Sequence, residues 1–556
     1  MKFKKLFALT VTAAMTASFF TGCGASNSNT AAKKVETKAK ESIIYGINTA
    51  PSGVFNPLVA DTRYDVNVNA IIYLPLLKID SKGEFVPALA DKYEISEDQK
   101  TITYKLNSKA KWHDGKEVTA EDVIFTLTSL ADPKYGGELS DVVSRIKGAK
   151  EYSSGSAKNV LGLKAVDKST VQIELTEAYA PALIQISGLQ TIPKHIWEKE
   201  PVEKWAEAKD LLSKPVGSGA YKLKEYKDGE FVKFSSSEDF FGEKAKTKNF
   251  ILKVINGDTL QAELKNHSVD IANIKDIKKA DIESVKKDGY SVASYEDFMF
   301  QYMGFNLRNP KFQDKKVRQA FVYAIDRQAM VDKLIEGRGT GINTALLPTG
   351  WAYPKEGLNE YKYDVEKAKT LMKDAGWTLK DGTLVNAKEE KFEVTLKVPT
   401  GLKAREQSAL IIQEALKKIG VTVKIETMEF PTLMTQVVKN HEFDLYLMGN
   451  TLSADPDPKA FWYSKAASDK KGEIGYNIVG YRNEEVDKII DEGLSTIDRA
   501  KRTETYAKFG KIINEDVPEV FLYVQNNDIA YNKNLKNFNP STFDEFANIE
   551  NWEIQE

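Results

Sequence analysis

Histidine and cysteine are the side chains that most often bind metals or act as nucleophiles, and this chain has few of them. His113, His195, His267 and His441 are far apart, and none has a second histidine or a cysteine at the spacing of a metal site. Cys23 is the only cysteine, so the chain can form neither a disulfide framework nor a cysteine-based metal site. We therefore predict no metal site and no cofactor.

The serine and glycine motifs of the sequence also lack the spacing of known catalytic or nucleotide-binding motifs. Gly217-Ser218-Gly219 lacks the G-x-S-x-G spacing that exposes a nucleophilic serine on a strand-to-helix turn. The glycines of residues 337–341 have neither the Lys-Ser/Thr pair of a phosphate loop nor dinucleotide-binding spacing. An acid–base pair among the 80 Asp and Glu residues stays open. The sequence favours a ligand-binding protein without catalytic residues, and a lipid-anchored hydrolase is the less favoured alternative.

One segment combines carboxylates, prolines and aromatic rings, namely Asp455-Pro-Asp-Pro-Lys-Ala-Phe-Trp-Tyr463. Its prolines restrict the backbone. Asp455 and Asp457 supply negative charge, and Trp462 and Tyr463 supply rings on which a ligand can stack. We predict that these four side chains bind a ligand. A solvated surface loop is the alternative.

Length, charge and periodicity indicate what kind of scaffold carries this segment. Single cores stop growing near about 250 to 300 residues, so 556 residues should divide into two lobes or three domains. The formal charge is only −2 and is spread along the chain, which argues against a nucleic-acid partner. Period-two runs predict strands at 101–106, 170–175 and 392–398. Helical patterns at 317–325, 365–375 and 409–419 complete a mixed α/β class.

The N-terminal residues have the composition of a secretory signal. Three lysines precede a mostly apolar run over residues 6–20, which is too short to span a bilayer. The next residues resemble a bacterial lipobox, with Phe20 where that motif prefers leucine. We predict removal of residues 1–22, lipidation of Cys23 and a flexible tether over 23–41. A freely secreted protein is the alternative.

Four strings along the rest of the chain resemble, in order and spacing, the large solute-binding proteins of ABC importers. This is extracellular solute-binding protein family 5, which includes oligopeptide-, dipeptide- and nickel-binding proteins. The strings are Val86–Ile95 with Trp112–Val123, Pro215–Leu223, Phe305-Asn306 with Val317–Arg327, and Tyr363–Lys369 with Asp374–Gly376. The match runs from about residue 42 to the C-terminus.

The resemblance implies a two-lobed, periplasmic-binding-protein-like clamp of type II, with three domains and mixed β-sheets flanked by helices. Its expected parts are a first lobe over 42–300 with an inserted domain at about 76–195, a second lobe over 301–522, and a return to the first lobe over 523–556. Two chain crossings, near 299–306 and 521–531, would form the hinge. Ligand binding would favour the closed state by contacting both lobes.

The resemblance also implies roles for single residues. In peptide-binding members, an acid just before an Asp/Glu-Pro pair neutralises the α-ammonium group of the peptide. Asp455 is the first candidate for this role. Asp457 is the second, because Asp455 stands one residue closer to Pro458 than in relatives. Arg405 would bind the C-terminal carboxylate of the ligand, and its alternative is a solvent-facing residue at the start of a helix.

By this resemblance, the chain is a lipid-anchored protein on the outer face of the cytoplasmic membrane. It would capture peptides and deliver them to an ABC permease. The expected partners are a peptide, the permease subunits and the membrane, through the lipid on Cys23, and we expect a monomer. The alternative is the same fold with a nickel chelate, an oligosaccharide or a signalling peptide as ligand.

Overall fold

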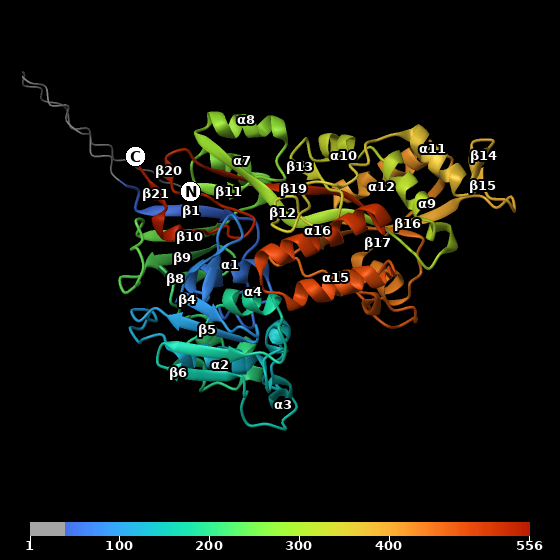
Figure 1. Ribbon diagram of the computed structural model, residues 1–556. Coiled ribbons are helices and arrows are strands. Elements are labelled where there is room, and N and C mark those ends of the chain that lie inside the picture. The colour runs from blue at the N-terminus through green and yellow to red at the C-terminus, as the bar shows by residue number, and fades with distance from the viewer. Residues whose placement is uncertain (1–38, 556) are drawn as a thin grey trace, which may run out of the picture. The chain divides into compact units, whose positions relative to one another are not determined.

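The largest element of the fold is an eleven-stranded mixed sheet (Figure 1). The computed structural model describes residues 39–555, so the predicted signal sequence, Cys23 and the predicted tether as far as residue 38 lie outside the described residues. Strand β13 (Gly339–Gly341) pairs with β19. The other strands follow the order β17 (Thr422–Met428), β16 (Glu393–Pro399), β18 (Leu445–Thr451), β12 (Tyr290–Phe305), β19 (Glu519–Asn532), β11 (Ile271–Asn273), β1 (Ser42–Ile47), β10 (Asn249–Val254), β9 (Phe231–Ser236) and β8 (Tyr221–Lys227).

Strands β12 and β19 form the centre of this sheet and are its longest strands. They pair antiparallel from Tyr290↔Asn532 to Gly304↔Glu519. Strands β11, β1, β10, β9 and β8 follow on one side, and β18, β16 and β17 follow on the other. The ladder is interrupted between Glu296↔Asn526 and Phe300↔Val524, where the register shifts. This interruption of the ladder lies where the two strand groups meet.

A separate four-stranded sheet belongs to residues 90–188, which we call the small-sheet region. Its order is β4 (Ala90–Ile95), β5 (Thr101–Leu106), β7 (Thr170–Glu174) and β6 (Leu163–Asp167). In β5 the alternate residues Ile102, Tyr104 and Leu106 are buried, as period two requires. Helices α2 (Ala120–Leu130), α3 (Ala149–Ser153) and α4 (Pro181–Gly188) complete the region.

Helices cover both strand groups of the large sheet (Figure 1). Beside β16, β17 and β18 lie α9 (Lys315–Ala324), α10 (Arg327–Leu334), α11 (Val365–Asp374) and α12 (Lys403–Lys417). Helices α15 (Glu484–Ser495) and α16 (Arg499–Asp516) run side by side. The remaining α-helices of the described residues are α1 (Arg63–Ile72), α5 (Lys194–Trp197), α6 (Lys209–Leu212), α7 (Leu260–Lys265), α8 (Lys279–Lys287), α13 (Phe430–Leu433) and α14 (Lys459–Trp462). The strand pairs β2–β3 (Leu77–Ile79, Phe85–Pro87), β14–β15 (Thr378–Lys380, Thr383–Val385) and β20–β21 (Leu535–Lys536, Glu553–Ile554) stand apart.

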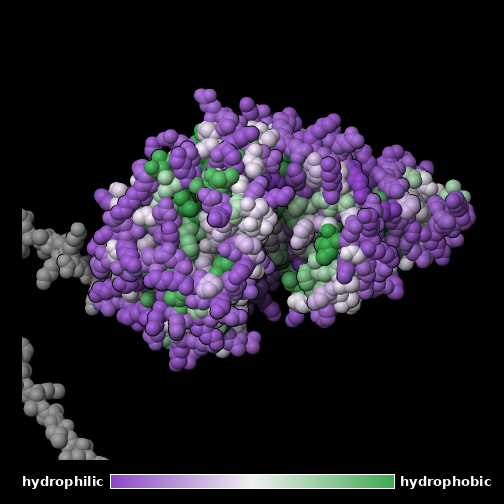
Figure 2. Space-filling model, turned by 90° about the horizontal axis from the view of Figure 1, so that it is seen from below, coloured by the Kyte–Doolittle hydropathy of each residue, from purple (hydrophilic) through white to green (hydrophobic). Residues whose placement is uncertain are grey.

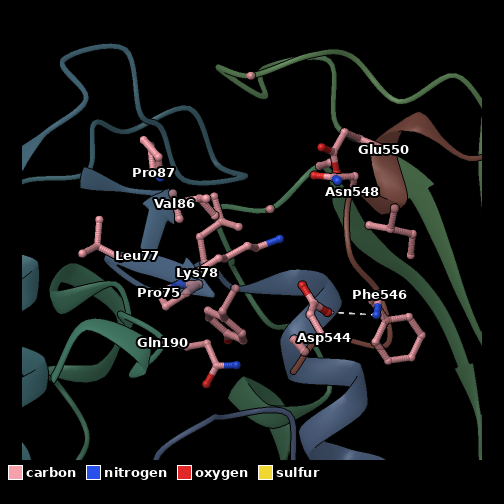
Figure 3. A pocket seen from close by; sticks show the side chains of 18 of the residues that line it. Pro75, Leu77, Lys78, Val86, Pro87, Gln190, Asp544, Phe546, Asn548 and Glu550 are labelled. Atoms are coloured by element: carbon pink, nitrogen blue, oxygen red, sulfur yellow. Dashed lines mark hydrogen bonds between the residues drawn. The ribbon is translucent and has the colours of Figure 1, made fainter. Parts of the chain in front are cut away.

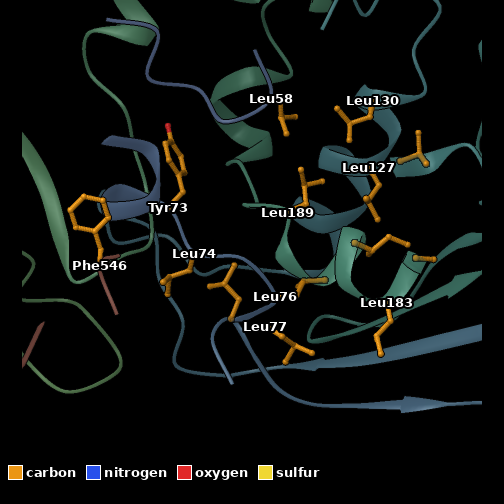
Figure 4. Packing of buried hydrophobic residues seen from close by; sticks show 14 of the residues in the cluster. Leu58, Tyr73, Leu74, Leu76, Leu77, Leu127, Leu130, Leu183, Leu189 and Phe546 are labelled. Carbon is orange, nitrogen blue, oxygen red and sulfur yellow. The ribbon is translucent and has the colours of Figure 1, made fainter. Parts of the chain in front are cut away.

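Buried apolar side chains form three clusters, as expected for a chain too long for one core. One cluster lies between β12, β16 and β18 and helices α9, α11 and α12. The largest extends into the small-sheet region: it contains Leu127 of α2 and Leu183 of α4 together with Leu74, Leu76 and Leu77, which follow α1 (Figure 4). The segment after α1 is therefore held by the helices of the small-sheet region.

The predicted elements at 101–106, 170–175, 317–325, 365–375 and 392–398 are present within two residues of the predicted bounds, and the helix predicted at 409–419 is present but begins earlier, at Lys403. The predicted mixed α/β class is confirmed. Among residues 39–555, no helix is both long and apolar enough to cross a membrane.

Candidate ligand-binding site

Asp455 is buried and is already paired with a cation. Its carboxylate accepts two hydrogen bonds from the guanidinium of Arg502, at 2.6 and 2.7 Å. Arg502 lies on α16 and also donates from Nε to the carbonyl oxygen of Gly493 at 2.9 Å. Burial alone would lower the pKa of Arg502, but the hydrogen bonds and charge of Asp455 outweigh it and raise this pKa. The negative charge of Asp455 is therefore neutralised within the protein.

Asp457 is in a different environment. Its Oδ2 accepts a hydrogen bond from the Tyr179 hydroxyl at 3.0 Å, and its Oδ1 accepts one from the backbone N–H of Lys459 at 2.8 Å. Within the described residues no ion pair joins Asp457 to a cationic side chain. Burial raises the pKa of Asp457 although both hydrogen bonds lower it. Asp457 thus offers a poorly solvated carboxylate without a cation.

Arg405 lies in the first turn of α12 and is only 9% exposed, so the alternative of a solvent-facing residue is wrong. Its Nε donates to the side-chain oxygen of Gln301 on β12 at 3.0 Å. The two terminal nitrogens of the guanidinium make no hydrogen bond with the described residues, and burial lowers the pKa of Arg405. The side chain is therefore a fixed cation with free donors.

Trp462 and Tyr463 are held by contacts with side chains of the protein. Trp462 is 4% exposed, and its ring packs against Tyr481, Phe509 and Phe521. The hydroxyl of Tyr463 donates to Asp491 on α15 at 2.8 Å. These contacts fix the end of the 455–463 segment, and a ligand contact from either ring stays a prediction.

The family is decided by comparison with known proteins. The model of the bacterial extracellular solute-binding proteins, family 5 middle region, matches residues 84–473. The chain belongs to this family. The resemblance predicted from the four strings is therefore confirmed, and with it the two-lobed clamp fold. The name of the family describes its members as extracellular proteins that bind solutes.

Individual relatives in the family match over nearly the whole chain. The oligopeptide-binding protein AppA of Bacillus subtilis is 31% identical over 543 residues, 96% of each chain. The structure of AppA from Bacillus subtilis in complex with a nonapeptide covers 94% of this chain and 100% of its own, with 29% identity and a TM-score of 0.70. The structure of NikZ from Campylobacter jejuni in complex with Ni(L-His) covers 92% and 99%, with 26% identity and a TM-score of 0.71.

The segment that carries Asp455 and Asp457 lies opposite the small-sheet region. Besides the Tyr179 contact, the backbone N–H of Ala180 donates to the carbonyl oxygen of Leu494 at 2.7 Å. Seen from below, the surface is hollowed between the part that contains the small-sheet region and the part that contains α15, with apolar residues on both walls (Figure 2). The two carboxylates therefore belong to a segment that faces another part of the fold rather than open solvent.

Sequence reasoning missed Arg502 and Tyr179, the two side chains that distinguish Asp455 from Asp457. Arg502 is an ordinary charged residue in a helical pattern, and Tyr179 is one of 24 tyrosines. They are 47 and 278 residues away from their partners. No local pattern could have marked either one, because only tertiary packing brings them to the segment.

Proposed function

We propose that this family member is the substrate-binding protein of an ABC importer and that it captures peptides in a cleft between two hinged lobes. The observation that carries the proposal is the carboxylate of Asp457, which is poorly solvated and has no cationic partner among the described residues. The similarity to an oligopeptide-binding protein and to a complex with a nonapeptide supports a peptide as the ligand.

We propose Asp457 as the partner of the peptide α-ammonium group. Asp455 was the first candidate from the resemblance, but Arg502 already neutralises it with two hydrogen bonds. Among the described residues, Asp457 accepts hydrogen bonds only from two neutral donors, the Tyr179 hydroxyl and the Lys459 N–H, so an ammonium group would supply the missing positive charge. Asp455 then has a positioning role, because its pairing with Arg502 fixes the backbone that precedes Asp457.

Arg405 is the proposed partner of a carboxylate on the ligand. Arginine binds carboxylates with paired donors, and the terminal nitrogens of Arg405 are free among the described residues while Gln301 orients the guanidinium. An extended peptide between the two groups would gain its affinity from backbone hydrogen bonds that do not depend on its side chains.

The proposed domains are those implied by the resemblance: 42–300 with an inserted domain at about 76–195, then 301–522, then 523–556. The long strands β12 and β19 support this division, because they join two strand groups and their ladder is interrupted between Glu296 and Phe300. We place the hinge at this interruption. Few ladder hydrogen bonds oppose bending there, and lobe closure needs only a few residues to change their backbone angles.

The proposal also includes removal of residues 1–22, lipidation of Cys23, a tether to residue 41, and docking of the monomer on a permease. The lipobox-like end of the signal sequence supports the anchor. The anchored protein would work on the outer face of the cytoplasmic membrane, where an importer takes up its cargo.

The test is mass spectrometry of the ligand released on denaturing the full-length protein purified from cells, followed by calorimetry with the species found. We expect short peptides, whose affinity falls by at least about tenfold in Asp457→Ala. The matched control Glu442→Gln changes an exposed carboxylate that pairs with Lys471, and it should bind like the wild type. A metal chelate or sugar as the released ligand, or full peptide affinity in Asp457→Ala, would overturn the proposal.

A further inference from the structure

A second cavity lies away from the 455–463 segment, between the β2–β3 hairpin and the last part of the chain (Figure 3). Its volume is about 500 Å³, within the range of small-molecule sites. Pro75, Leu77 and Val86 lie on one wall, with Asn548 and Glu550 on the opposite one. None of its lining residues comes from residues 244–542, so it contains no part of the proposed peptide site.

Two oppositely charged side chains reach this cavity without pairing. The chain of Lys78 extends into the space between the two walls, and Asp544 lies beneath it (Figure 3). Among the described residues, the Asp544 carboxylate accepts one hydrogen bond, from the backbone N–H of Phe546 at 2.9 Å. Within residues 39–555 neither Lys78 nor Asp544 takes part in an ion pair. Each charge is half-buried and therefore lacks both full hydration and a protein counter-ion.

The surroundings of Asp544 favour an ammonium partner. Burial raises its pKa, and the charge of Lys78 offsets this only in part. Glu550 on the opposite wall and Glu243 add further negative charge and also have no ion pair among the described residues. A ligand that carries both charges would satisfy Lys78 and Asp544 together, whereas a simple cation would leave Lys78 without a partner.

Apolar groups fill much of the remaining wall. Phe240, Phe241, Phe543 and Phe546 contribute rings, and Tyr73 contributes a fifth. An apolar side chain on the ligand would bury its surface here, at roughly 25 cal/mol for each Å² removed from water. The cavity thus combines two side chains of opposite charge with an apolar lining, which is the usual composition of a small-molecule site.

We propose that this cavity is a second binding site, which takes a free amino acid or a zwitterion of similar size, with its ammonium group on Asp544 and its carboxylate on Lys78. The site is independent of the proposed peptide function, because its lining residues belong to segments that precede residue 244 or follow residue 542. It can therefore be occupied whether or not the lobes close.

The probe is L-phenylalanine, measured by calorimetry with the full-length protein at pH 7. We expect it to bind, and we expect N-acetyl-L-phenylalanine and L-phenylalaninamide to bind at least about tenfold more weakly, because each lacks one of the two charges. Asp544→Asn and Lys78→Met should weaken L-phenylalanine to a similar extent. Asn keeps the oxygen that accepts from Phe546, so this variant should fold.

Further variants test whether binding belongs to this cavity rather than to the peptide site, and whether a loss of binding reflects unfolding. Asp457→Asn and Glu442→Gln change carboxylates outside the cavity and should bind L-phenylalanine like the wild type. Ala88→Trp should fill the cavity and abolish binding while peptide affinity stays unchanged. The proposal is overturned if L-phenylalanine does not bind, if it binds but the loss follows Asp457→Asn instead of Asp544→Asn, or if either derivative binds as tightly as L-phenylalanine.

Discussion

Asp455 and Asp457 carry their charges in opposite ways although one proline separates them. Asp455 forms a buried ion pair with Arg502, and both side chains are less than a tenth exposed. Asp457 has only neutral donors and a raised pKa. A group that must bind a cationic ligand needs its charge unpaired until the ligand arrives, and only Asp457 meets that condition.

The Asp455–Arg502 pair should contribute strongly to stability. Replacement of Arg502 by methionine leaves a buried carboxylate without its partner, which should lower the free energy of unfolding by about 3 to 5 kcal/mol. Urea denaturation of the ligand-free protein measures this loss. Lys315→Met removes an exposed partner of Glu515 and should cost much less. Equal losses in the two variants would show that Asp455 is solvated in solution.

The raised pKa of Asp457 should make peptide binding depend on pH. The ammonium group binds the deprotonated acid, so affinity should fall as the pH drops through this pKa, which lies above the usual value of 3.8. Stability has the opposite sign, because the proton is held more tightly in the folded state: this contribution is present below pH 3.8 and lost as the pH rises through the raised pKa. Calorimetry from pH 4 to pH 8 tests the affinity, and an equally steep pH dependence in Asp457→Asn would assign it to another group.

Specific side chains determine where individual helices begin. Helix α2 begins after Thr119, and Asp122 in its first turn accepts hydrogen bonds from the N–H and hydroxyl of Thr119, at 2.8 and 2.9 Å. Asp122 also accepts from the backbone N–H of Lys194 at 2.9 Å, so one carboxylate joins α2 to α5. No local pattern in the sequence indicates this second contact, because Asp122 and Lys194 are 72 residues apart.

Substitution of Asp122 by alanine should therefore cost more than the loss of a helix cap. The loss of the three bonds leaves two half-buried N–H groups and one hydroxyl without their acceptor, and we expect the free energy of unfolding to fall by about 2 to 3 kcal/mol in urea denaturation. Glu121→Ala, at the preceding position, removes a carboxylate that, among residues 39–555, pairs only with Lys194, in an exposed ion pair. A loss no larger than that of Glu121→Ala would mean that water replaces the lost bonds.

At the scale of the whole molecule, segments that are distant in sequence contact the turn between α15 and α16. The guanidinium of Arg499 donates to the carbonyl oxygen of Gly83 at 3.0 Å, and the N–H of Ile497 donates to Gln99 at 2.8 Å. With the bond from Ala180 to Leu494 at the end of α15, three separate segments contact this turn and the helix ends beside it. If the lobes hinge at β12 and β19, these bonds form only when the lobes approach each other.

Removal of these bonds should shift the free protein toward a more open state. We expect Arg499→Ala combined with Gln99→Ala to raise the radius of gyration measured by small-angle X-ray scattering, and a bound peptide to reduce it again. Lys488→Ala changes an exposed residue of α15 and should leave the radius of gyration unaltered. An unchanged radius in the double variant, with and without peptide, would contradict hinge bending at this place.

The sequence by itself determined the α/β class, the individual strands and helices, and the family. Hydrophobic periodicity and capping are local, and the four family strings are contiguous, so each can be read without knowledge of the fold. It also singled out the 455–463 segment, whose acids and prolines are neighbours in the chain. The domain boundaries and the ligand contacts of this segment stay predictions.

Tertiary structure alone decided which carboxylate is free. Charge pairing depends on distance in space, and Arg502 and Tyr179 reach Asp455 and Asp457 only through the packing of α16 and of the residues before α4. The second cavity also depends on tertiary packing, because Lys78 and Asp544 are separated by most of the chain. Burial makes these unpaired charges energetically unfavourable, since an unpaired charge is costly only where water cannot solvate it.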